Sequence, residues 1–476
     1  MKTAVAKRVP RRHMFGYGIG MYTSVSTLAL VSLYLPYFYT DVFLLSPAVM
    51  GVLFLVCRVW DGINDPVMGI IADNTNTRWG RFRPYLLFAP FVMIVFGTLT
   101  FTAPDMSATA KIIWAFATYI PLQMVKTAIA IPYFSIMPIM TTDTKERTII
   151  SAIQQLATPL AFMAASIAVL KIVGLFPTEK EGFFFSALIF CVIAAIVMWI
   201  TFYSTRSYDY PGNPLFEKED DEQKVPFKEK LKVITQNRPL ILVVGAFSML
   251  NLSSAVAYGV GLYFFKYNLD MVDKFPMFIG LSVFFTMIGA MLTPLLVKKV
   301  GKKNLLLIAN AISFVFGIII IYLSLGKDLE SLRAIWRPGK IAFVLAIATQ
   351  PFNGIVATML GALLPDTVDY AEWKTGLRAE GLINSIYMAG NKAGFALGGV
   401  ILGFGLAYFD YIPNQPSYSM ATLTGIFLML YGVSAITRVV LCALMLFHNL
   451  PDTRFQEILE DLRIRKRAES AVPEPA

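Results

Sequence analysis

Charged side chains are scarce in this chain. Only 15% of its 476 residues are Asp, Glu, Lys or Arg, whereas 56% are hydrophobic. Soluble globular proteins carry about 25% charged residues, so a water-facing surface could not be covered here. Most stretches of 20–30 residues are instead apolar and long enough to cross a bilayer as helices. The composition therefore excludes a soluble globular protein and predicts an all-α integral membrane protein.

Cysteine and histidine are also rare. The three cysteines, Cys57, Cys191 and Cys442, lie in apolar runs, so neither a disulfide framework nor a metal cluster is expected. The two histidines, His13 and His448, lie near the chain ends. This position argues against a histidine-built metal site and leaves no nucleophile–histidine–acid set deep in the chain. We therefore expect no cofactor, and a membrane-embedded enzyme is the least favoured class.

Apolar runs predict twelve membrane-spanning helices. They cover residues 15–40, 46–73, 84–104, 110–139, 147–174, 182–205, 238–266, 275–300, 303–325, 338–366, 378–408 and 420–450. The basic leader up to His13 runs into an apolar segment too long for a signal-peptide core, so we expect the first helix to be retained. A polar stretch with the run EKEDDEQK, residues 206–237, predicts a linker between two six-helix halves, 1–205 and 238–450, and a charged tail follows at 451–476.

Lysine and arginine residues are unevenly divided between the two sets of predicted loops. The termini, the linker and the loops on their side hold 28 of the 41, whereas the loops on the other side hold nine. Cytoplasmic loops carry the excess of positive charge, so both termini and the linker are predicted to be cytoplasmic, in the bacterial inner (plasma) membrane. The net charge of +10 reflects this bias beside anionic lipid headgroups, and no nucleic-acid partner is needed.

A few charged residues lie inside the predicted spans. The bases are Arg58, Lys126, Lys392 and Arg438, and the acids are Asp61 and Asp65. A charge near the bilayer centre is expensive, so these side chains have to face a wet cavity or one another. They are therefore candidates for function, except that Arg438 is interpreted as structural or as snorkelling to an interface.

The second predicted helix contains the strongest candidate site, in CRVWDGINDPVMG. Arg58, Asp61 and Asp65 are spaced i, i+3, i+7 and share one face, with Asn64 on the same flank. Two carboxylates one turn apart repel each other, so either one takes up a proton or a cation lies between them. Oxygen ligands of this kind suit a hard ion such as Na⁺. The alternative is a structural ion cluster in which Arg58 neutralises one aspartate.

Two lysines extend this set. Lys126 lies in the middle of the fourth predicted helix, too deep for easy snorkelling, and the adjacent Thr127 could lend a hydroxyl to the ion. Lys392 lies in a glycine-rich part of the eleventh helix, and it either faces a central cavity or makes a structural bond between helices. Without Arg438 the predicted cavity carries a net charge of +1, so a bound cation leaves an excess that favours an anionic solute.

Several segments resemble the glycoside–pentoside–hexuronide:cation symporters, the melibiose permease family of the major facilitator superfamily. They are YFYTDVFLLSPAVMGVLFLVCRVWDGINDPVMG, TRWGRFRPYLL, AIPYFSIMP and LLPDTVDYAEWKTGLRAEG. The resemblance covers almost the full chain. It implies a major facilitator fold and cation-coupled uptake of a sugar-like solute. One chain carries a complete path and so needs no partner subunit. We accordingly expect a monomer.

The resemblance also carries over residue by residue on the cation side. The family's cation ligands in the second helix match Asp61, Asn64 and Asp65, and its threonine in the fourth helix matches Thr127. The family's lysine in the eleventh helix matches Lys392. The cation site therefore looks intact, with Na⁺ or H⁺ expected at Asp61 and Asp65.

The solute side departs from the family's pattern. Solute contacts are expected at positions that match the family's sugar-binding residues or adjoin them: Thr23, Lys126, Phe134, Gln155, Asn391 and Lys392. An aspartate of the family has no counterpart in the first helix, another is replaced by Ala130, and a tryptophan of the tenth helix is replaced by Ala357. The predicted function is therefore cation-coupled import of a sugar-like anion of uronide type. A neutral glycoside or pentoside and a lysolipid-like anion are the alternatives.

Overall fold

Helices make up the regular structure of this protein. The computed structural model describes residues 8–141, 143–211, 233–450 and 452–470, and no β-strand occurs within those ranges. A helix satisfies its backbone hydrogen bonds internally, which is what a bilayer demands of a spanning segment. The prediction of an all-α membrane fold is confirmed.

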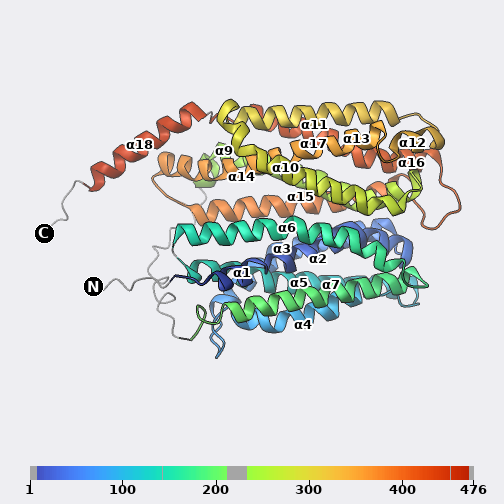
Figure 1. Ribbon diagram of the computed structural model, residues 1–476, viewed down its shortest axis with the longest axis horizontal. Helices are drawn as coiled ribbons and strands as arrows, with labels where there is room; N and C mark the ends of the chain where they lie inside the picture. Colours follow the sequence, from blue (N-terminus) through green and yellow to red (C-terminus); the bar gives the residue numbers. More distant parts are fainter. Residues whose placement is uncertain (1–7, 142, 212–232, 451, 471–476) are drawn as a thin grey trace.

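The first layer is built from the helices that precede the polar stretch. They are α1 (Arg11–Gly18), α2 (Met21–Tyr37), η1 (Phe38–Val42), α3 (Pro47–Asp73), α4 (Arg83–Thr100), α5 (Ala108–Met140), α6 (Thr144–Val173) and α7 (Glu179–Ser204). In Figure 1 these helices form the lower layer.

The second layer is built from the helices that follow. They are α9 (Arg238–Tyr263), η4 (Phe264–Asn268), η5 (Val272–Lys274), α10 (Phe275–Val300), α11 (Lys302–Ser324), α12 (Leu329–Trp336), α13 (Ile341–Ala348), α14 (Gln350–Thr375), α15 (Glu380–Tyr408), α16 (Met420–Phe427), η6 (Leu428–Gly432), α17 (Val433–Leu446) and α18 (Asp452–Ser470). Helices α1 and α18 lie toward the same end of the molecule, which we call the terminal end; the opposite end is the far end (Figure 1).

Eleven helical segments of the described chain are long and apolar enough to cross a membrane. The remaining predicted span, the eleventh at 378–408, corresponds to α15, which has 29 residues but a lower hydropathy because of Asn391, Lys392 and its glycines. Those glycines bring α15 close to α9. A Cβ atom on Gly394 would lie 2.4 Å from the backbone oxygen of Ser248, so no larger residue fits there.

Helix boundaries differ from the prediction at several places. The first predicted span is divided into α1 and α2, with a break next to Gly20, and it ends in the π-helical turn η1. The tenth is divided into α13 and α14, because Pro351 lacks the N–H that would continue the helix across Thr349. The short helix α12 was not predicted at all. The predicted linker, 206–237, lies mostly outside the described residues.

The helix α14 runs nine residues beyond its predicted end at residue 366, to Thr375. It is supported there by α18, which lies in the predicted charged tail. The Trp373 indole donates to the Asp461 carboxylate at 3.1 Å, and Tyr370 packs in one apolar cluster with Phe455 and Ile458. Tertiary contacts therefore keep a polar stretch helical.

The two layers contact each other closely at the far end. Gly51 of α3 lies so near Gly403 of α15 that a Cβ on Gly51 would be 3.2 Å from the Gly403 Cα. Thr40 and Tyr263 share a hydrogen bond between their hydroxyls at 2.7 Å, and the Tyr411 hydroxyl donates to the Asp41 carboxylate at 2.7 Å. These bonds connect the first layer to the second, so they hold the far end closed.

Candidate cation and solute site

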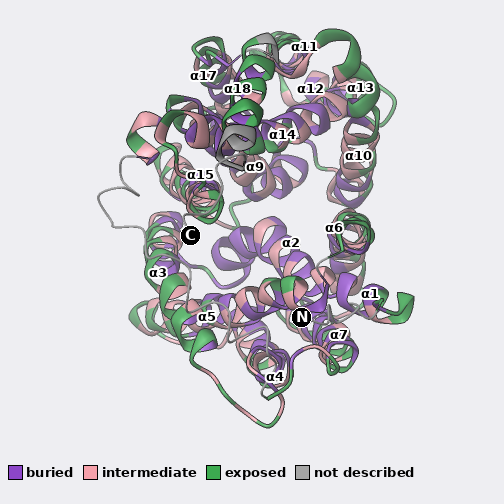
Figure 2. Ribbon diagram, turned by 90° about the vertical axis from the view of Figure 1, so that its left-hand side faces the viewer, coloured by how far each residue is buried: buried purple, intermediate pink, exposed green. Residues whose placement is uncertain are grey.

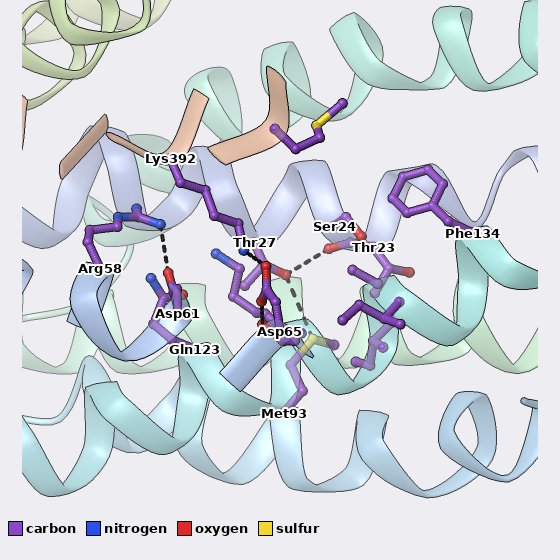
Figure 3. A pocket seen from close by; sticks show the side chains of 16 residues that line it. Thr23, Ser24, Thr27, Arg58, Asp61, Asp65, Met93, Gln123, Phe134 and Lys392 are labelled. Carbon is purple, nitrogen blue, oxygen red and sulfur yellow. Dashed lines mark hydrogen bonds and ion pairs between the residues drawn. The ribbon is translucent and has the colours of Figure 1, made fainter. Parts of the chain in front are cut away.

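The helix α3 presents Arg58, Asp61 and Asp65 to one cavity, as their i, i+3, i+7 spacing predicts (Figure 3). The Arg58 guanidinium donates to one oxygen of Asp61 at 3.1 Å. Asp61 is 5% exposed, and its other oxygen, Oδ1, is buried with no hydrogen-bond partner among the described residues. Arg58 therefore leaves one carboxylate oxygen available to a ligand.

Asp65 is held by two different helices. The Thr127 hydroxyl of α5 donates to Asp65 Oδ1 at 3.1 Å, and the Lys392 ammonium of α15 forms an ion pair with Asp65 Oδ2. Figure 3 shows the Lys392 side chain extending from α15 toward Asp65. Since α15 belongs to the second layer, this ion pair joins the two layers in the middle of their spans.

The cavity around these groups has a volume of about 330 Å³. This size lies at the lower end of the range for small-molecule sites, about 300–1,000 Å³. Its lining residues are Thr23, Ser24, Thr27, Arg58, Asp61, Asp65, Met93, Gln123, Lys126, Thr127, Ile129, Ala130, Ile131, Phe134, Met388 and Lys392. Phe134 and Met388 are 49% and 54% exposed and lie in the parts of α5 and α15 nearer the terminal end. The cavity is therefore most accessible from that end.

Three of the predicted solute positions line this cavity besides Lys392. Lys126 forms no ion pair or hydrogen bond within the described part of the chain, so its ammonium is available to a ligand. The Thr23 hydroxyl instead donates to the Ala194 carbonyl at 2.8 Å, which commits its proton to the helix packing. Phe134 offers an aromatic face at the more exposed side of the cavity.

Other predicted residues do not line the cavity. Gln155 lies exposed on α6, and Asn391 lies beside Lys392 with a buried Oδ1 that has no hydrogen-bond partner in the described part of the chain. Asn64 is also outside the lining, and its Nδ2 is buried without a partner among the described residues. Each asparagine is adjacent in sequence to a residue that lines the cavity, but neither lines it itself.

Several cavity residues escaped the sequence analysis because they carry no charge. Gln123 lines the cavity and donates to the Tyr119 hydroxyl at 3.0 Å, and Thr27 donates to the Thr23 carbonyl at 2.8 Å. A glutamine inside an apolar span was the signal that could have identified Gln123. Uncharged polar groups of this kind suit the hydroxyls of a solute.

Comparisons with known proteins agree with this architecture. Residues 16–452 match the family described as MFS/sugar transport protein. The chain is 32% identical to the isoprimeverose transporter of Lactiplantibacillus pentosus over 87% of this chain and 83% of that protein. It is 29% identical to a putative glycoside/cation symporter of Escherichia coli (97% of both chains) and 29% identical to the glucuronide carrier protein homolog of the same species (96% of both).

Solved structures share the fold at low sequence identity. A bacterial homolog of the human lysosomal transporter Spinster matches with a TM-score of 0.63 at 13% identity, over 95% of this chain and 99% of that one. Together with the family match, this places the two-layered helical fold among membrane transporters. The chain belongs to the MFS/sugar transport family, and it is a multi-pass membrane transporter and not an enzyme.

Proposed function

We propose that this protein is a cation-coupled secondary symporter that imports a sugar-like solute with an anionic group. The coupling cation is Na⁺ or H⁺. The observation that carries the proposal is the mid-span ion pair between Asp65 and Lys392, which joins the two layers beside a solute-sized cavity. The relatives named as a glycoside/cation symporter and a glucuronide carrier homolog support it.

Lys392 competes with the coupling cation for Asp65. A proton on Asp65 removes the charge that holds the ammonium, and Na⁺ needs the same carboxylate oxygens. Asp61 Oδ1, Asp65 and the Thr127 hydroxyl supply the oxygen ligands for Na⁺ in this proposal. The arriving cation thus replaces Lys392 rather than adding to it.

Displacement of Lys392 couples the ion to the solute. Once released, its ammonium joins that of Lys126 as a second unpaired positive charge in the same cavity. Two unpaired cations within low-dielectric walls attract an anion strongly. Cation binding therefore raises the affinity for an anionic solute, and by linkage the solute raises the affinity for the cation.

The closed far end and the accessible terminal end define one state of an alternating-access cycle. Figure 2 looks onto the terminal end, with the first layer below and the second above. The excess of lysine and arginine on the terminal side favours a cytoplasmic position for this end. In the proposal the structure is then inward-facing, and a single chain in the bacterial inner membrane transports its solute as the two halves rock about the site.

A neutral glycoside or pentoside is the second candidate for the solute. The observation that favours it is the set of uncharged polar groups in the cavity, including Ser24, Thr27 and Gln123, which can bind sugar hydroxyls. A neutral solute makes no use of the unpaired Lys126 ammonium, so the anionic class explains more of the cavity.

Uptake into proteoliposomes tests this proposal. Radiolabelled methyl β-D-glucuronide and methyl β-D-glucoside are compared under an inward Na⁺ gradient, an inward proton gradient and no gradient. The proposal predicts accumulation of the glucuronide above its outside concentration with one of the two gradients only. Equal, gradient-independent equilibration of both sugars would show that no cation is coupled.

A further inference from the structure

A second cavity, of about 340 Å³, lies within the second layer. Helices α9, α10, α11, α14 and α17 contribute to its lining. One lining residue, Tyr258, packs against Phe162 of α6 with 5.0 Å between the ring centroids. Because α6 belongs to the first layer, this cavity lies beside a contact between the two layers.

The only charged residue among those that line this second cavity is Arg438 of α17. Its guanidinium donates to the Asn353 side-chain oxygen, the Asn353 amide donates to Gln350 Oε1 at 3.1 Å, and the Gln350 amide donates to the Ala346 carbonyl at 3.0 Å. This chain of bonds ends on backbone, so it fixes the direction of the guanidinium before any ligand arrives.

Arg438 has no acidic partner in the described ranges of the chain, since no carboxylate lies within ion-pair distance of it. Its bond partner Asn353 lies well inside the span formed by α13 and α14, Ile341–Thr375, so the guanidinium is directed into the layer and does not snorkel to an interface. An unpaired charge at such a depth is costly to keep. A ligand that carries the missing negative charge removes that cost.

We propose that Arg438 anchors the carboxylate or sulfonate group of a sugar acid in this second cavity. The inference rests on the proposed function and assigns its solute to the sugar acids. A guanidinium has five N–H donors, and Asn353 accepts from one of its nitrogens, so an oxyanion can still be bound through two parallel hydrogen bonds. The side chains of Asn251, Ser254 and Tyr431 line the same cavity and provide partners for sugar hydroxyls.

The two lysines and Arg438 then have separate tasks. Lys126 and Lys392 are compact charges that raise the potential of the passage for any anion, whereas the planar guanidinium selects an oxyanion by geometry. The carboxylate and the sulfonate share this chemistry, and a matched pair of probes distinguishes them.

Binding to the purified full-length protein tests this assignment. The probes are methyl β-D-glucuronide, the corresponding 6-deoxy-6-sulfo glucoside and methyl β-D-glucoside. Each is titrated calorimetrically in the presence of the cation whose gradient drives uptake in proteoliposomes. We expect Arg438→Gln to weaken the two acids about 10-fold to 100-fold, the size of a lost charge-assisted bidentate contact, and to leave the glucoside within about twofold. Arg438→Lys recovers part of the loss. Arg337 is an exposed arginine, so Arg337→Gln is the control and should leave the affinities for the acids and for the glucoside unchanged.

Asn353→Asp is a second variant that preserves size and keeps the guanidinium. It places a carboxylate against Arg438. This carboxylate should pair with the guanidinium in place of the ligand's oxyanion and so abolish the preference for acids. The wild-type ratio of glucuronide to sulfo-glucoside affinity tells which oxyanion is preferred.

The outcomes separate this inference from the proposed function. If the wild type binds the glucuronide with cation dependence but both variants bind it equally well, the Arg438 site is refuted and the symporter stands. If the wild type binds acids no better than the glucoside, the sugar-acid assignment is refuted. If the wild type binds none of the three probes, the proposed function and this site both fail.

Discussion

At the scale of single residues, the chemistry centres on Asp65. One oxygen accepts from Thr127 and the other pairs with Lys392, while Asp61 has an oxygen with no partner among the residues that the structure describes. Arg58 pairs with Asp61 and Lys392 pairs with Asp65, so in the proposed mechanism a coupling cation at Asp65 replaces Lys392. This exchange distinguishes the site from a permanent structural ion cluster, in which each partner stays bound.

Removing Lys392 should free the cation site. We expect Lys392→Ala to bind Na⁺ or a proton at Asp65 about 10-fold more tightly, because the competing ammonium is gone. Solute-dependent stimulation of cation binding should be lost in the same variant. Calorimetry of Na⁺ binding at several pH values measures both effects. Lys327→Ala, in an exposed loop, is the matched control, and unchanged or weaker cation binding in Lys392→Ala would contradict the competition.

At this scale the sequence indicated charges but not the direction of side chains. Arg58, Asp61 and Asp65 could be predicted to share a face because helix geometry is regular. The sequence could not show that Asn64 does not line the cavity, or that Lys392 pairs with Asp65 across the layers. It also could not show that Arg438, interpreted as structural or as snorkelling, donates to Asn353 on a helix far away in sequence.

At the scale of elements, glycine decides how α15 packs. Gly394, Gly398 and Gly403 follow one another along the helix and meet α9 or α3 at distances that exclude a side chain. This close packing brings the Lys392 ammonium within reach of Asp65, because larger side chains on α15 would hold it farther from α9 and α3. The same small residues lowered the hydropathy of α15, so the feature that makes the helix functional also weakened its signal as a span.

A single methyl group should therefore disturb this interface. Gly394→Ala places a Cβ 2.4 Å from the Ser248 carbonyl oxygen and is expected to cost about 1–3 kcal/mol of stability. Gly361→Ala in α14 is the control, because nothing lies within 4 Å of its added Cβ. Thermal unfolding in detergent, monitored by size-exclusion recovery, compares the two. A Gly394→Ala protein as stable as the control would show that α15 and α9 can move apart here at little cost in stability.

Helix boundaries were the least predictable part of the elements. The sequence DTVDYAEWKT is polar enough to indicate a loop, yet it is the last part of α14 because α18 packs against it. Apolar cores such as that of α7 were predictable from composition alone. The remaining helix ends depend on tertiary contacts, which a local sequence pattern does not contain.

At the scale of the whole molecule, the two layers are held together at the far end by Asp41. Its carboxylate accepts hydrogen bonds from the Tyr267 and Tyr411 hydroxyls, and its backbone oxygen accepts from the Asn414 amide at 2.8 Å. Asp41 is only 5% exposed. The first predicted helix ended at residue 40, so the sequence analysis left Asp41 outside it and missed a buried acid that joins both layers.

Weakening this closure should open the far end. Asp41→Leu removes the shared acceptor of the two tyrosines, and we expect the far-end-open population to rise by about 10-fold or more. Spin labels at Leu175 and Ile412, which are exposed in far-end loops on opposite layers, report the separation by electron–electron resonance. Asp105→Leu, an exposed acid paired with Lys180, is the control. A distance distribution unchanged from the wild type would refute the role of Asp41.

Concentrative uptake by an Asp65→Asn variant tests the central claim most directly. The asparagine keeps the size of the side chain but removes the charge for which Lys392 and the cation compete. Radiolabelled methyl β-D-glucuronide is followed in proteoliposomes under the coupling gradient, with Asp105→Asn as the matched control. We predict that Asp65→Asn does not accumulate the glucuronide above its outside concentration while the control accumulates it like the wild type. Gradient-driven accumulation by Asp65→Asn would contradict the account.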